Sequence, residues 1–246
     1  MLDFEFYNMD CMEGMKQYPD KFFDLAVVDP PYGSGQELSE NSGGGTGTDS
    51  VRGSTGTSRH LQRKNVRKPD GTWGYANWRD MGGEVLKKIV AWDVAPSKEY
   101  FEELFRVSRN QIIWGGNYFD LPPTRCFLVW RKSNIPESFS MAMVEYAWTS
   151  FNANAKMFSF PSGGQAGRFH PTQKPVELYK WILNWYSQPG DKILDTHCGS
   201  ASSLIACHEL GRQYVGFEID KEYYTKARAR LEEAEAQQNI FTMGFA

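Results

Sequence analysis

The sequence lacks several features that would assign it at once to a common class of protein. No apolar run approaches the ~20 residues needed to cross a membrane, and Met1–Glu5 has neither the basic nor the apolar region of a signal peptide. The glycine pattern G-x-G-x-x-G of dehydrogenases is absent, and so is a P-loop lysine. We therefore expect a cytoplasmic protein that has no membrane partner and is neither a typical dehydrogenase nor a P-loop enzyme.

Cysteine and histidine are scarce, with four of each in 246 residues. No two cysteines form a C-x-x-C pair, and their spacing suits neither a disulfide framework nor a zinc site. We therefore expect reduced thiols and no metal. The cysteines in question are Cys11, Cys126, Cys198 and Cys207.

Positive charge is in slight deficit overall, with a net charge of −3, which argues against a non-specific coat on nucleic acid. One glycine- and serine-rich stretch, residues 35–80, is different: it cannot build a core, and we expect a flexible insertion in a domain made of residues 1–34 and 81–246. Its cations either follow DNA phosphates or belong to a solvated loop without a ligand. They are Arg52, Arg59, Arg63, Lys64, Arg67 and Lys68.

Outside this stretch, strand and helix patterns alternate, which is typical of an α/β domain. Apolar runs, some ended by an acid or by glycines, predict the buried strands of a mostly parallel sheet. We expect strands at 4–7, 24–28, 111–114, 126–130, 141–149, 192–194 and 213–217. We expect helices at 97–108, at 174–187 and at 220–237. Another helix should follow the small-residue turn 199–203 and end at residue 210.

The last quarter of the chain has the pattern of a nucleotide-binding βαβ unit. A strand ends at Asp195, the small residues Gly199–Ser203 lead into a helix, and a second strand ends at Glu218. Small residues let a ligand approach the backbone, and the start of a helix offers free amides. Glu218 follows Asp195 at roughly the twenty-residue spacing of an acid that binds ribose hydroxyls. An ordinary tight turn is the alternative.

The tetrapeptide Asp29-Pro30-Pro31-Tyr32 follows a buried strand, where α/β sheets bind ligands. An amine on a purine or pyrimidine ring is a poor nucleophile because its lone pair is delocalised into the ring. The Asp29 carboxylate and a proline carbonyl offer two acceptors for its protons, and the prolines fix their direction. Tyr32 offers a face on which a base can stack. A simple strand-ending turn is the alternative.

With these residues in view, the chain resembles the amino-group DNA methyltransferases in the permuted arrangement called the beta class. Thr196-His197 and Ala201 depart from the Pro-Phe and the second glycine of that family's cofactor loop. The segments that carry the resemblance are Asn8-Met9-Asp10-Cys11, Asp29-Pro30-Pro31-Tyr32, His170-Pro171-Thr172-Gln173-Lys174-Pro175, Leu194 to Ser202 and Gly216-Phe217-Glu218-Ile219-Asp220.

The resemblance implies a circularly permuted, Rossmann-like, doubly wound sheet, mostly parallel with one antiparallel strand. The strand around Phe6 should lie beside the strand around Phe217, so that Asp10, Asp195 and Glu218 converge on S-adenosylmethionine. The resemblance implies that Asp29, Pro30, Pro31 and Tyr32 are catalytic. It implies cofactor binding by Asp10, Cys11, Asp29, His170, Thr172, Lys174, Asp195, Thr196, His197, Cys198, Gly199, Ser200, Glu218, Ile219 and Asp220.

Three of these residues have open alternatives. Lys174 contacts the methionine carboxylate of the cofactor or is a solvated charge. We expect His170 to order its segment and His197 to pack in its loop, because direct transfer needs no histidine base. Trp92-Asp93 either lines the base pocket or packs, and we favour packing.

The implied function is methyl transfer from S-adenosylmethionine to the exocyclic amine of a flipped base in double-stranded DNA. Because the first catalytic-loop residue is Asp29, adenine N6 is preferred over cytosine N4. The alternatives are an RNA or protein-amide methyltransferase and a silent DNA-binding subunit. A bacterial or phage origin, a homodimer and a cognate restriction endonuclease are further expectations from the resemblance.

Overall fold

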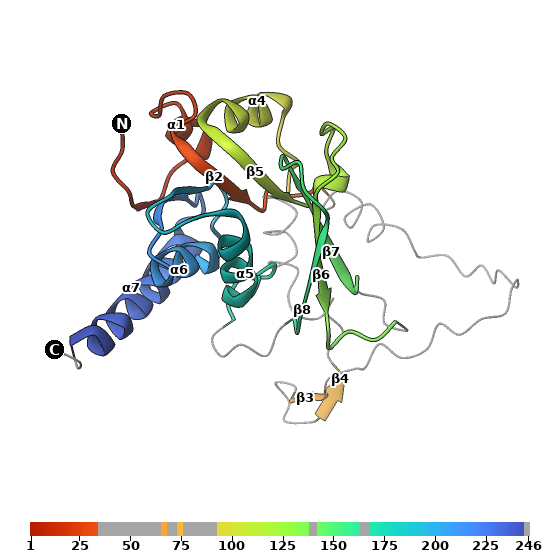
Figure 1. Ribbon diagram of the computed structural model, residues 1–246. Helices are drawn as coiled ribbons and strands as arrows, with labels where there is room; N and C mark the ends of the chain where they lie inside the picture. Colours follow the sequence, from red (N-terminus) through yellow and green to blue (C-terminus); the bar gives the residue numbers. More distant parts are fainter. Residues whose placement is uncertain (34–64, 68–72, 76–92, 138–141, 163–167, 244–246) are drawn as a thin grey trace, which may run out of the picture. The chain divides into compact units, whose positions relative to one another are not determined.

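The computed structural model describes residues 1–33, 65–67, 73–75, 93–137, 142–162 and 168–243 (Figure 1). The chain divides into two compact units. The smaller unit spans Pro31–Ala95 with Ser138–Ser140, and the larger unit contains the rest. The smaller unit contains an antiparallel pair, β3 (Asn65–Arg67) and β4 (Trp73–Tyr75). The insertion expected at 35–80 falls within it, and its flexibility stays a prediction because most of it lies outside the described residues.

The larger unit is built on an eight-stranded sheet in the order β1-β10-β9-β2-β5-β7-β6-β8. Every neighbouring pair is parallel except the two that involve β7, which runs antiparallel to both β5 and β6. The predicted mostly parallel sheet with one antiparallel strand is therefore confirmed. The strands are β1 (Phe6–Tyr7), β2 (Phe23–Val28), β5 (Ser108–Trp114), β6 (Phe127–Lys132), β7 (Val144–Thr149), β8 (Lys156–Phe160), β9 (Lys192–Asp195) and β10 (Gln213–Phe217).

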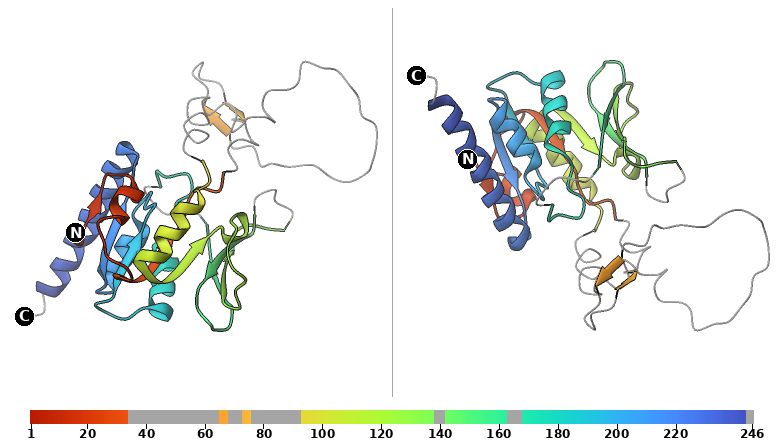
Figure 2. Two further views of the ribbon diagram at one scale, coloured as in Figure 1. Left: turned by 90° about the horizontal axis from the view of Figure 1, so that it is seen from above. Right: turned by 90° about the horizontal axis from the view of Figure 1, so that it is seen from below.

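The permuted order of the chain is visible in the sheet. Strands β9 and β10, from the end of the chain, lie between β1 and β2, from its beginning (Figure 2). Phe6 pairs with Gly216 and Tyr7 with Phe217, which confirms the predicted neighbourhood of these strands. A side chain cannot replace the hydrogen of Gly216, since its Cβ would lie 2.6 Å from the Cys198 sulfur.

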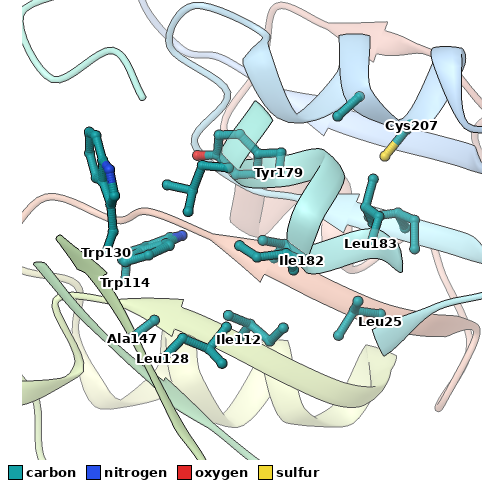
Figure 3. Close-up of a cluster of buried hydrophobic side chains, with 14 residues drawn as sticks. Leu25, Ile112, Trp114, Leu128, Trp130, Ala147, Tyr179, Ile182, Leu183 and Cys207 are labelled. Atoms are coloured by element: carbon teal, nitrogen blue, oxygen red, sulfur yellow. The ribbon is translucent and has the colours of Figure 1, made fainter. Parts of the chain in front are cut away.

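Helices cover both faces of the sheet, which is why strand β2 is apolar almost throughout. On one face, Ala26 and Val28 pack in a cluster with Leu104 of α4 (Lys98–Val107), and α1 (Cys11–Met15) adds to it. On the other face, Leu25 packs with α5 (Val176–Tyr186) (Figure 3). Burial of such a side chain contributes ~1.5–3 kcal/mol. Helices α6 (Ser202–Glu209) and α7 (Lys221–Met243) extend this second face.

In the larger unit, one α-helix and one strand lie where the sequence predicted none. Helix α1 has only five residues, too few to show helical periodicity, and the Asp10 side chain caps it by accepting from Met12 N at 2.7 Å. Strand β8 alternates half-buried and exposed residues, so it lacks the continuous apolar run of a central strand. Helix α5 starts two residues later than predicted because Pro175 is extended and precedes it.

Two features are absent from the described residues. In this part of the chain no helix has both the length and the low polarity needed to cross a membrane. The same residues contain no group of three or more His, Cys, Asp or Glu side chains able to hold a metal ion.

Candidate active site

Four carboxylates follow the ends of four neighbouring strands: Asp10 after β1, Glu218 after β10, Asp195 at the end of β9 and Asp29 after β2. These strands are parallel, so their carboxyl ends share one edge of the sheet. Burial, together with the charges of Asp29 and Glu218, raises the pKa of Asp195 to about 7. The edge lies at the point where strand order reverses between β9 and β2, the usual ligand site of doubly wound sheets.

The turn after β9 is held by Asp195, whose carboxylate accepts hydrogen bonds from Ser203 Oγ and from the His197 amide at 3.0 Å. Gly199 has a φ of +51°, and a Cβ there would lie 3.1 Å from the His170 ring. Ser200 Oγ bonds Ser202 Oγ at 3.1 Å, and the Cys198 amide donates to the Phe217 carbonyl at 3.0 Å. The turn is therefore hydrogen-bonded to β10 and lies close to His170.

Glu218 uses both carboxylate oxygens to organise this edge. Its Oε2 accepts from the Gly199 amide at 2.9 Å and its Oε1 from the Asp220 amide at 2.8 Å. Burial raises the pKa of this carboxyl above its usual value. The Asn8 side chain donates to the carbonyls of Glu218 and Ile219 at 2.8 and 3.1 Å, which joins the end of β1 to the end of β10.

Three further predicted cofactor-binding residues, Ile219, Asp220 and Cys11, lie next to these acids in the sequence. Ile219 is 67% exposed. Asp220 begins α7 as predicted, because its Oδ1 accepts from Glu222 N at 2.8 Å and Tyr223 N at 3.0 Å. Burial raises the pKa of the Cys11 thiol to about 12, so this thiol is neutral at physiological pH.

Two of the residues that depart from the family's cofactor loop, Thr196 and His197, contact Tyr100 of α4. Thr196 Oγ1 shares hydrogen bonds with Tyr100 OH at 2.6 Å and with His197 Nδ1 at 2.9 Å. The Tyr100 and His197 rings pack edge to face with centroids 5.5 Å apart. Burial lowers the pKa of His197 to about 4, so its ring is neutral near pH 7. This environment supports the packing interpretation of His197.

The His170–Pro175 segment precedes α5, and His170 lies close to Gly199 in the turn after β9. His170 Nδ1 bonds Thr172 Oγ1 at 3.2 Å, and its ring lies 4.4 Å from that of Tyr223. Burial, with Lys174 and Arg168 nearby, lowers the pKa of His170 to about 4. A neutral ring packed on Tyr223 and against Gly199 fits the predicted ordering role.

Lys174 is not a solvated charge, so that alternative was wrong. Its side chain is 3% exposed, and its ammonium pairs with Asp29 and with Glu145 Oε2, the latter at 3.1 Å. The ammonium also lies 5.2 Å from the Trp114 ring centroid. The prediction that Lys174 contacts the cofactor stays a prediction. Sequence reasoning missed Glu145, whose only local signal was an acid in an apolar strand.

The catalytic-loop candidates fall in both units: Asp29 and the buried Pro30 in the larger, Pro31 and Tyr32 in the smaller. Within the smaller unit, Asp93 Oδ1 accepts from the Tyr32 and Gly33 amides, each at 3.0 Å. Asp93 is buried, so the packing expected of it includes a specific backbone contact. No sequence signal links positions 61 residues apart.

The predicted DNA-contacting residues cannot be placed. Arg52, Arg59, Arg63, Lys64 and Lys68 lie outside the described residues, and Arg67 is described only as backbone in β3. Their role stays a prediction.

Comparisons with known proteins agree with this geometry. A family model described as DNA methylase (N6_N4_Mtase) matches residues 129–229, a segment that includes His170–Pro175 and both cofactor-side strands but not Asp29. Over this segment the chain is similar to the amino-group DNA methyltransferases.

Two curated relatives match a shorter part. This chain is 43% identical to Type II methyltransferase M2.DpnII of Streptococcus pneumoniae over 63 residues. The match covers 26% of this chain and 24% of M2.DpnII. The chain is 41% identical over 63 residues to Type II methyltransferase M.HpaI of Haemophilus parainfluenzae, of which 20% is covered. The matched segment therefore spans only about a quarter of these relatives.

Solved structures share the fold over most of the chain. The M1.HpyAVI–SAM complex aligns with a TM-score of 0.51 at 18% identity, covering 92% of this chain and 98% of that one. The cytosine-N4-specific PvuII DNA methyltransferase aligns with a TM-score of 0.53 at 11% identity, covering 96% and 93%. At these identities the likeness shows the Rossmann-like fold alone.

Proposed function

We propose that this protein is an S-adenosylmethionine-dependent DNA methyltransferase that methylates the exocyclic amine of a base flipped out of duplex DNA, with adenine N6 the preferred acceptor. The observation that carries the proposal is the gathering of Asp29, Asp195 and Glu218 at one edge of the sheet, close enough for their charges to interact. A catalytic carboxylate and a cofactor cradle from opposite ends of the chain thereby share one site.

The residues at this edge fit the cofactor chemically. S-adenosylmethionine carries a sulfonium and an ammonium, and an edge with Asp10, Asp195 and Glu218 favours positive charge. Glu218 stands at the end of the second strand of the βαβ unit, where an acid binds ribose hydroxyls. Gly199 has a left-handed backbone conformation and no side chain, whereas a Cβ there would lie close to the His170 ring. When bound, the cofactor supplies an electrophilic methyl group.

The chain's own residues then position the target amine. Asp29 accepts a hydrogen bond from one N–H, and the Pro30 carbonyl accepts from the other, which pulls the nitrogen towards tetrahedral geometry and takes its lone pair out of conjugation with the ring. The nitrogen bonds directly to the methyl group as the methyl–sulfur bond breaks, which leaves S-adenosylhomocysteine, and the surplus proton on nitrogen passes through its hydrogen bond to Asp29 and on to water. No covalent intermediate forms on the enzyme, so catalysis consists of positioning and electrostatics. Tyr32 stacks on the flipped base, a contact worth ~1–3 kcal/mol.

The choice of base rests on Asp29, because the resemblance associates Asp at this position with adenine and Ser with cytosine. The fold does not decide it, since a cytosine-N4-specific enzyme also shares it. An RNA or protein-amide methyltransferase would use the same loop chemistry, and a silent DNA-binding subunit would need no cofactor. A homodimer, a cognate restriction endonuclease and a bacterial or phage origin remain part of the proposal.

Nucleoside mass spectrometry tests the proposal directly. Unmethylated duplex DNA, RNA and protein extract are incubated separately with the protein and isotope-labelled S-adenosylmethionine. We expect labelled N6-methyladenine from DNA alone. N4-methylcytosine would overturn the choice of base, and label in RNA or glutamine would overturn the substrate class. If calorimetry detects no binding of S-adenosylmethionine, the silent-subunit alternative holds.

We also expect Asp93→Ala to slow methyl transfer about 10- to 100-fold while the Kd for S-adenosylmethionine stays within about twofold. The substitution removes the acceptor of the Tyr32 and Gly33 amides, and hydrogen bonds to a charged group contribute ~1.5–3 kcal/mol each. Single-turnover kinetics with labelled cofactor measures the rate. Asp93→Asn, which keeps one oxygen acceptor, should lose less. Equal rates for wild type and Asp93→Ala would contradict this role.

A further inference from the structure

Four charged side chains of alternating sign form a chain that ends at the catalytic carboxylate. Lys132 of β6 pairs with Glu145 Oε1 of β7 at 2.6 Å, Glu145 Oε2 pairs with Lys174 at 3.1 Å, and Lys174 pairs with Asp29 Oδ2. Strand β7 thus reaches the residue that follows β2 through a single lysine. No motif of the family resemblance includes Lys132 or Glu145.

The lysines of this chain are almost withdrawn from water. The side chains of Lys132 and Lys174 are 10% and 3% exposed, and that of Glu145 is 24% exposed. A buried charge is tolerated when it is paired, and removing one partner leaves an uncompensated charge. The four charges sum to zero, and each lysine has at least one carboxylate partner within ion-pair distance. Trp114 and Trp130 flank the two ammonium groups at 5.2 and 5.4 Å.

We propose that Lys174 and Glu145 are positioning residues for Asp29: Lys174 fixes the direction of the Asp29 carboxylate, and Glu145 holds the Lys174 ammonium in place. The proposal rests on the function proposed above, in which Asp29 accepts from the target amine. It assigns a part in that reaction to β7, a strand distant from both the cofactor turn and the catalytic loop in sequence.

Glu145 has a second effect on the acceptor. An ammonium paired with Asp29 alone would neutralise that carboxylate and weaken it as a hydrogen-bond acceptor. Because Glu145 shares the same ammonium, Asp29 keeps more of its negative charge while its orientation stays fixed. Burial disfavours the charged form of Lys174, yet Asp29 and Glu145 outweigh it and raise its pKa. Burial likewise opposes ionisation of Glu145, but Lys174 and Lys132 lower its pKa.

Without the Lys174 ammonium, the Asp29 and Glu145 carboxylates should disfavour each other's ionisation. Lys174→Met removes the ammonium between Asp29 and Glu145, while Glu145 keeps Lys132 as a partner. Two neighbouring carboxylates then share a single cation, which disfavours the ionisation of both. Other titratable groups act on Asp29, Lys174 or Glu145 from adjacent elements. They are Asp195 of β9, Tyr100 of α4, Tyr179 of α5, His170 of the segment before α5 and Lys132 of β6.

The test is the pH profile of single-turnover methyl transfer at saturating S-adenosylmethionine. For Lys174→Met we expect the acid limb to move up by about one pH unit or more, because a protonated Asp29 accepts poorly. Adding Glu145→Gln to this variant removes the competing carboxylate and should return the limb towards the wild-type position, while the maximal rate stays low. A purely structural role predicts no such return. An unmoved limb in Lys174→Met, or no return in the double variant, would overturn the proposal.

Two further measurements complete the design. Glu145→Gln alone keeps the lysine and carries the test if Lys174→Met does not fold; we expect about tenfold slower transfer with a cofactor Kd within about twofold, and a wild-type rate would overturn the proposal. Lys180→Met is the matched control, since it breaks the half-exposed pair with Glu209 and should leave the limb unchanged. If the wild-type protein transfers no methyl group, the proposed function is wrong and this inference fails with it. If the wild-type protein is active, the variants test this inference alone.

Discussion

Asp29→Ala is expected to abolish methyl transfer, with a loss of at least about 10³-fold, while cofactor binding survives. The loss of one preorganised group that stabilises the reacting atoms costs about 10²–10³ in rate, and here the same carboxylate also orients the amine. Lys174 keeps Glu145 as a partner in this variant, so the buried ammonium is not left unpaired. Single-turnover transfer and calorimetric titration with S-adenosylmethionine measure the two properties separately.

Asp3→Ala provides a matched control for this experiment, because Asp3 is an exposed aspartate outside the candidate site. It should behave as wild type in both assays. Normal turnover by Asp29→Ala would refute the assigned role of the carboxylate. Loss of cofactor binding together with transfer would instead show that Asp29 acts on the cofactor side of the site.

Glu218→Gln is expected to weaken S-adenosylmethionine binding about 100-fold or more. The carboxylate accepts from two backbone amides, Gly199 at 2.9 Å and Asp220 at 2.8 Å. A glutamine amide has one oxygen, so its NH₂ group would face one of these donors and leave it without an acceptor. A buried donor without a partner costs ~1–3 kcal/mol. The substitution also removes the charge expected to bind the ribose hydroxyls.

Calorimetry gives the affinity of this variant, and thermal melting reports the stability lost with the backbone contacts. Glu233→Gln, on the exposed side of α7, is the matched control and should change neither. An unaltered Kd in Glu218→Gln would show that the acid holds the turn after β9 without contributing to a cofactor site. Together with Asp29→Ala, this variant separates binding from transfer.

Several features of the fold follow from local sequence. Apolar runs such as 24–28 predict buried parallel strands because helices cover both faces, and this prediction is confirmed. The order of the motifs implied that β1 lies beside β10, and the register of Phe6 with Gly216 confirms it. Short motifs carry this information because an acid at a strand end or a small-residue turn is determined by backbone geometry over a few residues.

Elements without a strong local pattern were not predictable in this way. Helix α1 is a single capped turn and a half, and β8 is an edge strand of half-buried residues. Such segments are stabilised mainly by their neighbours, so propensity and periodicity say little about them.

What the sequence by itself determined, then, is the α/β architecture, its permuted strand order and the set of acids that follow the strands. Only the tertiary structure decided which distant groups contact one another: Asp93 the loop amides, Glu145 Lys174, and Lys174 Asp29. The reason is physical. Such a contact forms only when the fold brings groups that are distant in sequence within reach, and no residue type indicates which distant group will be its partner.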